Sequence, residues 1–341
     1  MADESIEKRK LDHIEINLHE DVKSSQTTGF DRYRLVHQAL PEIDFNRIDT
    51  SLDLFGKSLK SPFLISSMTG GVKGARIINE NLARTAERMG IAMGVGSQRP
   101  MIENPAVKSS FEIRKVAPSI LLFANIGAVQ LNYGVNTQDV KKLIDDISAD
   151  ALILHLNTMQ EVFQPEGQVN FSGLLTKIAS LVDVLSVPVI VKEVGWGISG
   201  KLAHTLEGIG VSAVDVAGAG GTSWSQVESF RLKDPIRLRA AETFRNWGIP
   251  TVDCLTDIAA NTTTMKVIAS GGLTTGVDVV KALALGACLC GFAGRILKAA
   301  TRSEEELELE LNTLQFELKA AMFGIGARSL ADIKPEVLLM R

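Results

Sequence analysis

Polar side chains that can transfer protons or bind a cation cluster at the end of one apolar run. His155 and Asn157 share one face of this predicted strand, and Gln160 and Glu161 follow it directly. An imidazole, two amides and a carboxylate can orient a small substrate, move a proton and ligate a metal. Lys192 ends the next apolar run, where a lysine either extends its ammonium group to solvent or serves a bound ligand. A single histidine is more often structural, but this grouping favours a functional site.

Glycine-rich turns follow three of the apolar runs, at Gly220–Thr222, Ser270–Leu273 and Gly291–Arg295. Glycine lets the backbone approach a ligand closely, and free N–H groups at the start of a helix favour a phosphate. Each turn taken alone is also explained as a tight connection between a strand and a helix. Their occurrence together predicts a site for a phosphate-bearing ligand.

One motif points to a different fold. Gly195–Gly200 matches the G-x-G-x-x-G pattern of dinucleotide-binding domains, and Asp215 lies about twenty residues further on. That motif normally opens its fold, whereas four strand–helix units precede it here. Lys192 and Glu193 also stand directly before it. We therefore do not predict a dinucleotide-binding domain from this match.

The architecture follows from eight short apolar runs separated by segments of helical length. Such spacing predicts parallel strands, because a parallel crossover needs a dozen or more residues. Eight units fit a closed (β/α)8 TIM barrel of the α/β class better than an open doubly wound sheet, which the pattern alone leaves possible. In such a barrel the active site lies at the carboxyl ends of the strands, where the residues above fall. The predicted strands are Phe63–Ser67, Ile91–Val95, Leu121–Ile126, Ala151–Leu156, Val189–Glu193, Ala213–Val216, Val267–Ser270 and Cys288–Phe292.

The segments outside this repeat predict an arm and additional helices. Residues 1–59 are expected to form an N-terminal arm and a poorly ordered lead-in, and residues 60–341 to form the barrel. The long connection Thr222–Lys266 predicts two helices, one around Ile236–Trp247 and one starting near Asp253. A final helix is expected over Glu304–Phe323, because Ser303 is a good N-cap residue with Glu306 three positions later.

Composition excludes several classes of protein. The 341 residues are 45% hydrophobic and 22% charged, which is enough apolar material for a large core and argues against disorder. A net charge of -4 gives no general attraction to nucleic acid or to an anionic membrane. No apolar run has the length of a membrane span or the form of a secretory signal. The three cysteines, Cys254, Cys288 and Cys290, lack zinc-ligand spacing and suit a reduced core. We expect a cytoplasmic protein that binds neither nucleic acid nor membrane.

Several of these motifs resemble those of the type 2 isopentenyl-diphosphate isomerases. The resemblance lies in Met68–Gly71, Ser97–Arg99, His155–Asn157, Gln160–Glu161 and a basic N-terminal motif at Arg9, Lys10 and Asp12–Ile14; the turns at Gly220–Trp224, Ser270–Gly272 and Gly291–Gly294 are similar to the flavin-binding turns of that family. It extends from residue 8 to about residue 295. Asp12 stands where the resemblance leads us to expect a longer acidic side chain. Single glycine turns recur in all FMN barrels, so the specificity comes from the combination.

The resemblance implies an activity and a role for each matching residue. It implies that reduced FMN, with Mg²⁺, serves the interconversion of isopentenyl and dimethylallyl diphosphate, with NADPH as reductant and a homotetramer or homo-octamer as assembly. Gln160, His155, Asn157 and Lys192 would form the catalytic group, and Glu161 would bind Mg²⁺. The substrate would contact Arg9, Lys10, Ser97, Gln98, Arg99, His155, Asn157 and Gln160; the FMN would contact Ser67, Met68, Thr69, Gly70, Ser97, Asn125, Lys192, Thr222, Gly271, Gly272, Ala293 and Gly294.

Elementary chemistry agrees with these roles and leaves alternatives open. A single carboxylate suffices for Mg²⁺ when substrate phosphates and water complete its shell. The guanidinium groups of Arg9 and Arg99 suit a diphosphate, although residues 8–10 also fit a solvated charge run. Three alternatives remain at this level: an FMN barrel that oxidises a hydroxy acid or a dihydropyrimidine, a lyase using Lys192 as a Schiff-base amine, and a non-catalytic flavin- or phosphate-binding protein.

Overall fold

Eight parallel strands close into a barrel in this computed structural model, which describes residues 2–68, 70 and 73–341. Around the barrel the strands follow one another in chain order, and β11 pairs with β4 to complete the ring. All eight predicted strands are confirmed within two residues at each end, and closure rules out the open sheet. The barrel strands are β4 (Phe63–Ile65), β5 (Ala92–Gly94), β6 (Leu122–Gly127), β7 (Ala151–His155), β8 (Val189–Lys192), β9 (Ala213–Asp215), β10 (Lys266–Ala269) and β11 (Leu289–Phe292).

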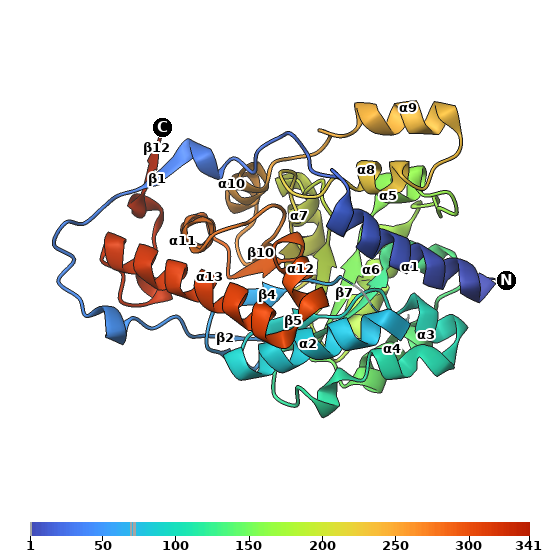
Figure 1. The fold of residues 1–341 in the computed structure, drawn as a ribbon, viewed down its shortest axis with the longest axis horizontal. Coiled ribbons are helices and arrows are strands. Elements are labelled where there is room, and N and C mark those ends of the chain that lie inside the picture. Colours follow the sequence, from blue (N-terminus) through green and yellow to red (C-terminus); the bar gives the residue numbers. More distant parts are fainter. Residues whose placement is uncertain (1, 69, 71–72) are drawn as a thin grey trace.

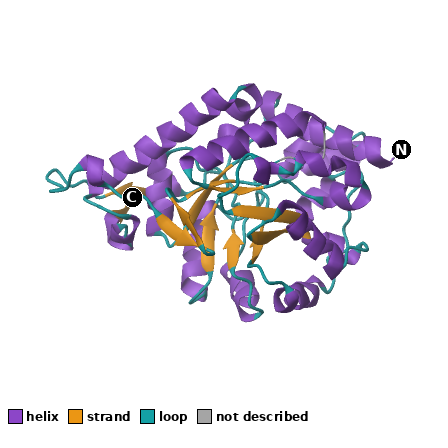
Figure 2. Ribbon diagram, turned by 90° about the horizontal axis from the view of Figure 1, so that it is seen from below, coloured by secondary structure: helices purple, strands orange, loops and turns teal. Residues whose placement is uncertain are grey.

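Helices surround this barrel and bury the outer faces of the strands (Figures 1 and 2). The outer helices are α2 (Lys73–Met89), α4 (Thr137–Ile147), α6 (Leu174–Val184), α7 (Gly200–Gly208), α10 (Thr251–Asn261), α11 (Gly276–Ala284), α12 (Gly294–Arg302) and α13 (Glu304–Ile325). Shorter helices stand in the loops that follow strands: α3 (Arg99–Glu103), α5 (Thr158–Phe163), α8 (Trp224–Ser229) and α9 (Pro235–Thr243).

Side chains along β7 alternate between two apolar clusters, one between the barrel and its helices and one inside the barrel. Leu152 and Leu154 pack with the helices in the larger apolar cluster, whereas Ala151 and Ile153 belong to the cluster inside the barrel. Side chains alternate between the two faces of a strand, so the face that bears Ala151 and Ile153 continues to His155. The fold therefore directs the polar end of this strand toward the interior of the barrel mouth.

The connection between β9 and β10 contains three helices where two were predicted. The helix expected around Ile236–Trp247 is the shorter α9, and the one expected near Asp253 is α10, which begins at Thr251. The helix that the prediction lacked, α8, has only six residues. A helix of that length shows no repeated apolar spacing, so periodicity does not reveal it.

The final helix follows its prediction and its expected cap. Ser303 Oγ accepts a hydrogen bond from the Glu306 N–H at 3.1 Å. The helix α13 continues to Ile325, two residues beyond the predicted end, and Gly326 ends it with a φ of 77°. Buried leucines at intervals of three and four residues bind it to α11, α12 and α2.

Residues 2–59 contain more regular structure than the predicted arm and lead-in, and irregular segments join its elements. Residues Ala2–His19 form the helix α1, which lies across the carboxyl end of the barrel (Figure 1). The hairpin of β2 (Leu52–Leu54) and β3 (Lys57–Leu59) packs into the cluster inside the barrel and closes its opposite end. A third segment, β1 (Tyr33–Leu35), pairs antiparallel with the C-terminal β12 (Leu338–Met340).

Candidate active site at the mouth of the barrel

His155 is held as a neutral ring at the mouth. Its Nδ1 lies 2.8 Å from Asn125 Oδ1, and Asn125 Nδ2 donates to the Val95 carbonyl at 3.0 Å. Because the amide oxygen faces the ring, Nδ1 carries the proton and Nε2 is left as an acceptor. Burial, followed by the charges of Lys192 and Lys10, lowers the pKa of His155 to about 4. His155 therefore offers hydrogen bonds at neutral pH without adding charge.

The loop after β7 brings the predicted amides and carboxylate together, with one carboxylate more than predicted. Asn157 Nδ2 donates to Gln160 Oε1 at 3.2 Å and to Glu161 Oε1 at 2.9 Å. Gln160 Nε2 donates at 3.0 Å to Glu228 of α8, whose side chain is 0% exposed. Glu161 Oε2 also accepts from the Gln168 N–H at 2.6 Å. The four side chains form one buried network, so each amide is turned in a defined direction.

Lys192 does not extend to solvent. Its ammonium group lies 3.3 Å from Asp215 Oδ2 of β9 and donates to the Glu193 carbonyl at 2.9 Å. Ser270 Oγ holds the other oxygen of Asp215. The ammonium group is thus held by a carboxylate and a backbone carbonyl, an arrangement that does not present a free amine for a Schiff base.

The turns after β10 and β11 differ in what they offer to a phosphate. Gly271 has a φ of +97°, and an added Cβ there would lie 2.1 Å from the Gly218 carbonyl, so this glycine is needed for backbone packing. The helix that follows, α11, is capped by its own Thr275 and Asp278. In contrast, Ala293 gives α12 no side-chain cap, and the nearest atom to a Cβ on Gly294 would be 3.8 Å away. The open N–H groups of the first turn of α12 are therefore the better phosphate site.

The G-x-G-x-x-G match is explained by an internal carboxylate. Glu193 Oε2 accepts from the N–H groups of Val194, Gly195 and Trp196 at 2.6, 2.7 and 2.6 Å. Asp257 accepts from the Gly200 N–H at 2.5 Å. The backbone donors that a dinucleotide phosphate would need are already occupied, so the decision not to predict a dinucleotide site here is supported.

Three cationic side chains gather where α1 meets the loop after β5. Lys10 Nζ donates to the Gly70 carbonyl and, at 3.1 Å, to the Ser97 carbonyl, and it lies 5.6 Å from the centre of the Phe111 ring. Burial, followed by the charge of Arg9, lowers the pKa of Lys10 to about 7. Burial, followed by Arg99, likewise lowers the pKa of Arg9. Repulsion between these buried positive groups is relieved when an anion binds, so the cluster is a candidate anion site.

Gln98 does not reach the mouth as predicted. Its side chain is fully buried, Nε2 donates to the Leu143 carbonyl at 3.1 Å, and Oε1 accepts from the Asn125 N–H at 2.9 Å. Both ends of the amide are thus used inside the barrel wall. Its expected role in holding the diphosphate is corrected to supporting Asn125.

The remaining predicted contacts border the same opening. Ser67 and Met68 follow β4, and the buried Ser67 Oγ, Ser66 Oγ and Asn157 Oδ1 have no hydrogen-bond partner among the described residues. Thr222 Oγ1 donates to Asn17 of α1 at 3.4 Å. Thr69, also predicted to contact the cofactor, lies outside the described residues.

Two residues important to the site were missed from the sequence. Glu228 carries its carboxylate to Gln160, and His13 Nε2 of α1 lies 2.9 Å from the same carboxylate. The His13 ring also packs edge-on against Trp224 at 5.1 Å. His13 stands in the quoted N-terminal motif, but nothing along the chain connects it with Glu228, which lies far away in the sequence.

Comparison with known proteins decides the family. The profile of the FMN-dependent dehydrogenase family matches residues 2–109 and 135–340. The isopentenyl-diphosphate delta-isomerase of Rickettsia felis is 51% identical over 332 residues, which cover 97% of this chain and 96% of the relative. That of Rickettsia bellii is 50% identical over 333 residues, or 98% of this chain and 97% of the relative. This chain belongs to the isopentenyl-diphosphate delta-isomerase family. As a member, it is an isomerase built on an FMN-dependent barrel.

Solved structures of more distant proteins support the fold of this isomerase family member. A flavocytochrome b2 with pyruvate bound has a TM-score of 0.70 at 18% identity and covers 96% of this chain and 82% of its own. A mandelate oxidase with (S)-mandelic acid has a TM-score of 0.68 at 17% identity and covers 98% of this chain and 93% of its own. At these identities the likeness concerns the barrel alone.

The residues of the mouth fit the FMN that the family implies. A flavin ring presents several hydrogen-bonding atoms, and the unpartnered Ser66, Ser67 and Asn157 oxygens are buried beside the strand ends where it would lie. Its phosphate matches the uncapped start of α12 at Gly294. Within the described ranges, no three His, Cys, Asp or Glu side chains are close enough to hold a metal by themselves, and no helix is long and apolar enough to cross a membrane.

Proposed function

We propose that this protein interconverts isopentenyl and dimethylallyl diphosphate, using reduced FMN and Mg²⁺, and thereby serves isoprenoid biosynthesis. The observation that carries the proposal is the cationic cluster of Arg9, Lys10 and Arg99 at the same mouth as the Gln160–Glu228 pair. A diphosphate held by the cluster would present its short hydrocarbon tail to the amides and carboxylates. The names of the relatives that are about half identical support the same reaction.

Movement of the double bond needs one proton added to an alkene carbon and another removed from a neighbouring carbon. Reduced FMN, when bound, supplies an acid and base at its ring nitrogen N5 without net oxidation. Gln160 would orient the substrate or relay a proton, because its amide is fixed between Asn157 and the carboxylate of Glu228. Burial alone would raise the pKa of Glu228, but the hydrogen bonds from His13 and Gln160 and the charge of Arg231 lower it, so Glu228 would act here as an ionised acceptor that fixes the amide.

The other residues of the chain bind and orient. Arg9, Lys10 and Arg99 would neutralise the diphosphate. Glu161 would ligate Mg²⁺ together with diphosphate oxygens and water, which is the usual composition of such a site. His155 would donate or accept hydrogen bonds without charge, and Lys192 would place a positive charge where it stabilises an anionic reduced ring.

Water exclusion is a further requirement, because a cationic intermediate formed from an alkene would react with water. The helix α1 supports this requirement, since it lies across the mouth and its His13 packs against Trp224. Arg9, Lys10 and the cover of the site would then belong to one element, α1.

The assembly, location and reductant belong to the same proposal. We infer a homotetramer or homo-octamer in the cytoplasm, reduced by NADPH. Size-exclusion chromatography with light scattering measures the assembly, and anaerobic bleaching of the flavin by NADPH measures the reduction. A monomer, or a flavin that NADPH does not bleach, contradicts the corresponding part.

The decisive experiment is an anaerobic NMR assay of isopentenyl diphosphate with FMN, Mg²⁺ and limiting reductant in deuterated water. Dimethylallyl diphosphate formed in large excess over the reductant, with deuterium incorporated, supports the isomerase. Glu228→Gln should remove most of the turnover, about 10²-fold or more, while FMN still binds. Glu336→Gln, an exposed carboxylate far along the chain, serves as the matched control.

The same assay separates the competing functions. An FMN oxidoreductase, the class to which the distant structural neighbours belong by name, would consume an electron acceptor and change the oxidation state of its substrate. A Schiff-base lyase would be trapped by borohydride at Lys192. A non-catalytic binding protein would bleach on reduction and give no product, and would be indifferent to Glu228→Gln or Glu161→Gln.

A further inference from the structure

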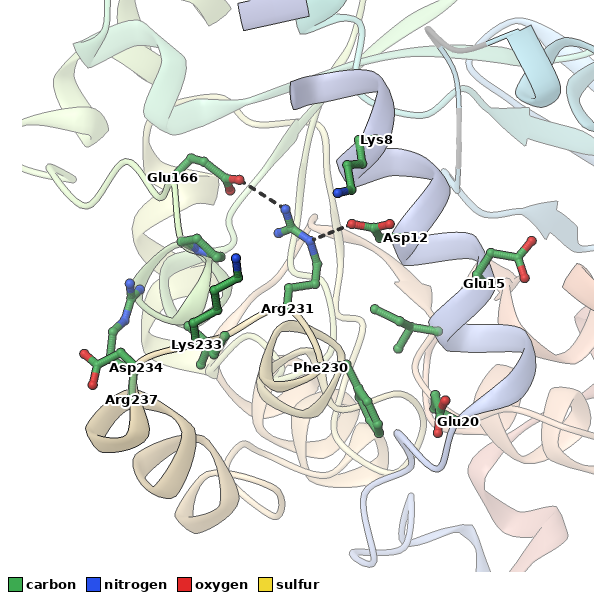
Figure 3. A pocket seen from close by; sticks show the side chains of 13 residues that line it. Lys8, Asp12, Glu15, Glu20, Glu166, Phe230, Arg231, Lys233, Asp234 and Arg237 are labelled. Carbon is green, nitrogen blue, oxygen red and sulfur yellow. Dashed lines mark hydrogen bonds and ion pairs between the residues drawn. The ribbon is translucent and has the colours of Figure 1, made fainter. Parts of the chain in front are cut away.

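Arg231 stands behind the catalytic network without touching the mouth. It follows α8 by two residues, and its side chain is 9% exposed. Its guanidinium contacts three carboxylates from three parts of the chain: Nη1 lies 2.8 Å from Glu228, Nη2 lies 3.1 Å from Glu166, and Nε lies 3.5 Å from Asp12 of α1. Figure 3 shows Arg231 between α1 and the Glu166 loop, at the edge of a cavity of about 780 Å³.

We propose that Arg231 is a positioning residue that fixes the carboxylate of Glu228, and through it both the Gln160 amide and the helix α1. The proposal rests on the proposed function, because it assigns a supporting residue to the same site. Among the described residues, the hydrogen bonds and ion pairs of Arg231 go to Asp12, Glu166 and Glu228, none of which is a predicted substrate or cofactor contact, so its influence on catalysis would pass through Glu228.

The two carboxylate oxygens of Glu228 have different partners. Oε1 faces the site, where it accepts from Gln160 Nε2 at 3.0 Å and lies 2.9 Å from His13 Nε2. Oε2 faces away and accepts from Arg231 Nη1 at 2.8 Å. A carboxylate rotates about its last bond unless both oxygens are engaged. The contact at Oε2 therefore holds the carboxylate from the side opposite to Gln160 and His13 and restricts its rotation.

The direction of the Gln160 amide depends on that arrangement. An ionised carboxylate only accepts hydrogen bonds, so Gln160 must turn its NH2 group toward Glu228 and its oxygen toward Asn157 Nδ2, as observed at 3.2 Å. A displaced Glu228 would leave Gln160 free to rotate by half a turn and exchange donor for acceptor. In part of the molecules, Gln160 would then have its NH2 group and its oxygen in exchanged positions.

The shape of arginine explains why this residue type stands here. A planar guanidinium offers donors in several directions, so one side chain can hold Glu228, Glu166 and Asp12 together. A lysine would preserve the charge beside the buried Glu228 but would hold fewer partners in fixed directions. The contact with Asp12 also connects the carboxylate to α1, the element that bears Arg9 and Lys10.

The test compares Arg231→Gln and Arg231→Lys with wild type in the holoenzyme. For Arg231→Gln we expect kcat to fall roughly 10- to 100-fold, as for a small misplacement of a reacting group. KM for isopentenyl diphosphate and FMN affinity should stay within about threefold, since their predicted contacts are intact. Arg231→Lys should recover part of kcat and, by keeping the charge, guards against simple misfolding.

A second comparison isolates the route through Gln160. If Arg231 acts by orienting that amide, Arg231→Gln added to Gln160→Ala should lower kcat little further than Gln160→Ala alone. Arg245→Gln is the matched control, because Arg245 also contacts the arm, at Asp21 and the Lys23 carbonyl, but not Glu228. Fully additive losses in the double variant, or an unchanged kcat in Arg231→Gln, would overturn the proposal.

Trypsin cleavage within α1 gives a readout that needs no turnover. Arg231→Gln should expose the bonds after Lys8, Arg9 and Lys10 at least about threefold faster than in wild type, since α1 loses a contact at Asp12 and an oriented Glu228 at His13. If the wild-type protein does not isomerise the substrate, but Arg231→Gln is still cleaved faster than wild type, the proposed function is refuted and the positioning role of Arg231 is retained. Equal cleavage of both proteins contradicts the role assigned to Arg231 in holding α1.

Discussion

Proton uptake on substrate binding is the sharpest consequence of the cationic cluster. The ammonium group of Lys10 has its pKa lowered to about 7 by burial and by Arg9 and Arg99. At pH 8 only about 10% of such groups are charged in the free protein. A diphosphate placed between the three side chains favours the charged form, so binding at pH 8 should take up about 0.9 proton per site.

The pH dependence follows with a definite sign. Affinity for the diphosphate should fall about fivefold between pH 7 and pH 8 and about tenfold between pH 8 and pH 9, because the binding-competent ammonium becomes scarcer. Stability changes in the opposite sense. Because the pKa of Lys10 is lower in the folded protein than in the unfolded chain, the free energy of unfolding should rise with pH above about 7.

Calorimetry in buffers of different ionisation enthalpy measures this uptake directly. Isopentenyl diphosphate is titrated into the FMN-loaded protein at pH 8, where the diphosphate itself is already ionised. Lys10→Arg should bind without uptake, because a guanidinium stays charged. Lys8→Met removes the exposed neighbouring lysine and should leave the uptake unchanged. Uptake below about 0.2 proton in wild type would refute the reasoning.

The remaining predictions concern the flavin site and the frame. Lys192→Ala should lower the FMN reduction potential by an amount on the order of tens of millivolts, and an unchanged potential rules out this role of Lys192. The same change leaves Asp215 as an unpaired buried charge, so adding Asp215→Asn should recover stability but not the potential. Gly294→Ala should weaken FMN binding with little loss of stability, whereas Gly271→Ala should lower the urea concentration at the midpoint of unfolding. Equal midpoints for the two variants contradict this prediction. Ser303→Ala should cost about 1 kcal/mol in the free energy of unfolding, measured by urea titration, and no change would show that the cap is dispensable.

The barrel could be predicted from the sequence because its signals are local and repeated. Each strand is a short apolar run, and each turn after it contains residues that end a strand and begin a helix. The alternation along β7 could even be read to the level of faces, which placed His155 toward the interior. The closure of the ring is not local, but eight units of this size have few other ways to bury both faces of a parallel sheet.

The arm could not be predicted in the same way because its order comes from distant partners. The helix α1 has a mean hydropathy below zero and little apolar periodicity. Beside the packing of Ile14 on the core, its attachments include three polar contacts, from Lys10 to Ser97, from His13 to Glu228 and from Asn17 to Thr222. None of these pairings leaves a trace in local sequence.

Glu228 was missed for a related reason. It lies in a helix of six residues, between Val227 and Ser229, and a carboxylate in such a short surface segment usually faces solvent. Only the fold shows that His13 and Gln160 converge on it from two other segments, beside Arg231 three residues further along the chain. A buried carboxylate with that many partners costs desolvation, so it is retained for what it does at the site.

The polar attachment of α1 is itself a functional argument. A helix seated by apolar contacts would cover the mouth equally well with or without a ligand. This helix also carries Arg9 and Lys10 toward Arg99, where burial and then the neighbouring positive charges lower the pKa of Arg9 and of Lys10, so an entering anion would favour their charged forms. Its other contact, through His13 and Glu228, leads directly to Gln160. On the proposed function, a diphosphate that relieves this repulsion would strengthen the helix that covers the mouth and supports the Gln160 amide, and binding would thereby be coupled to a closed and correctly oriented site.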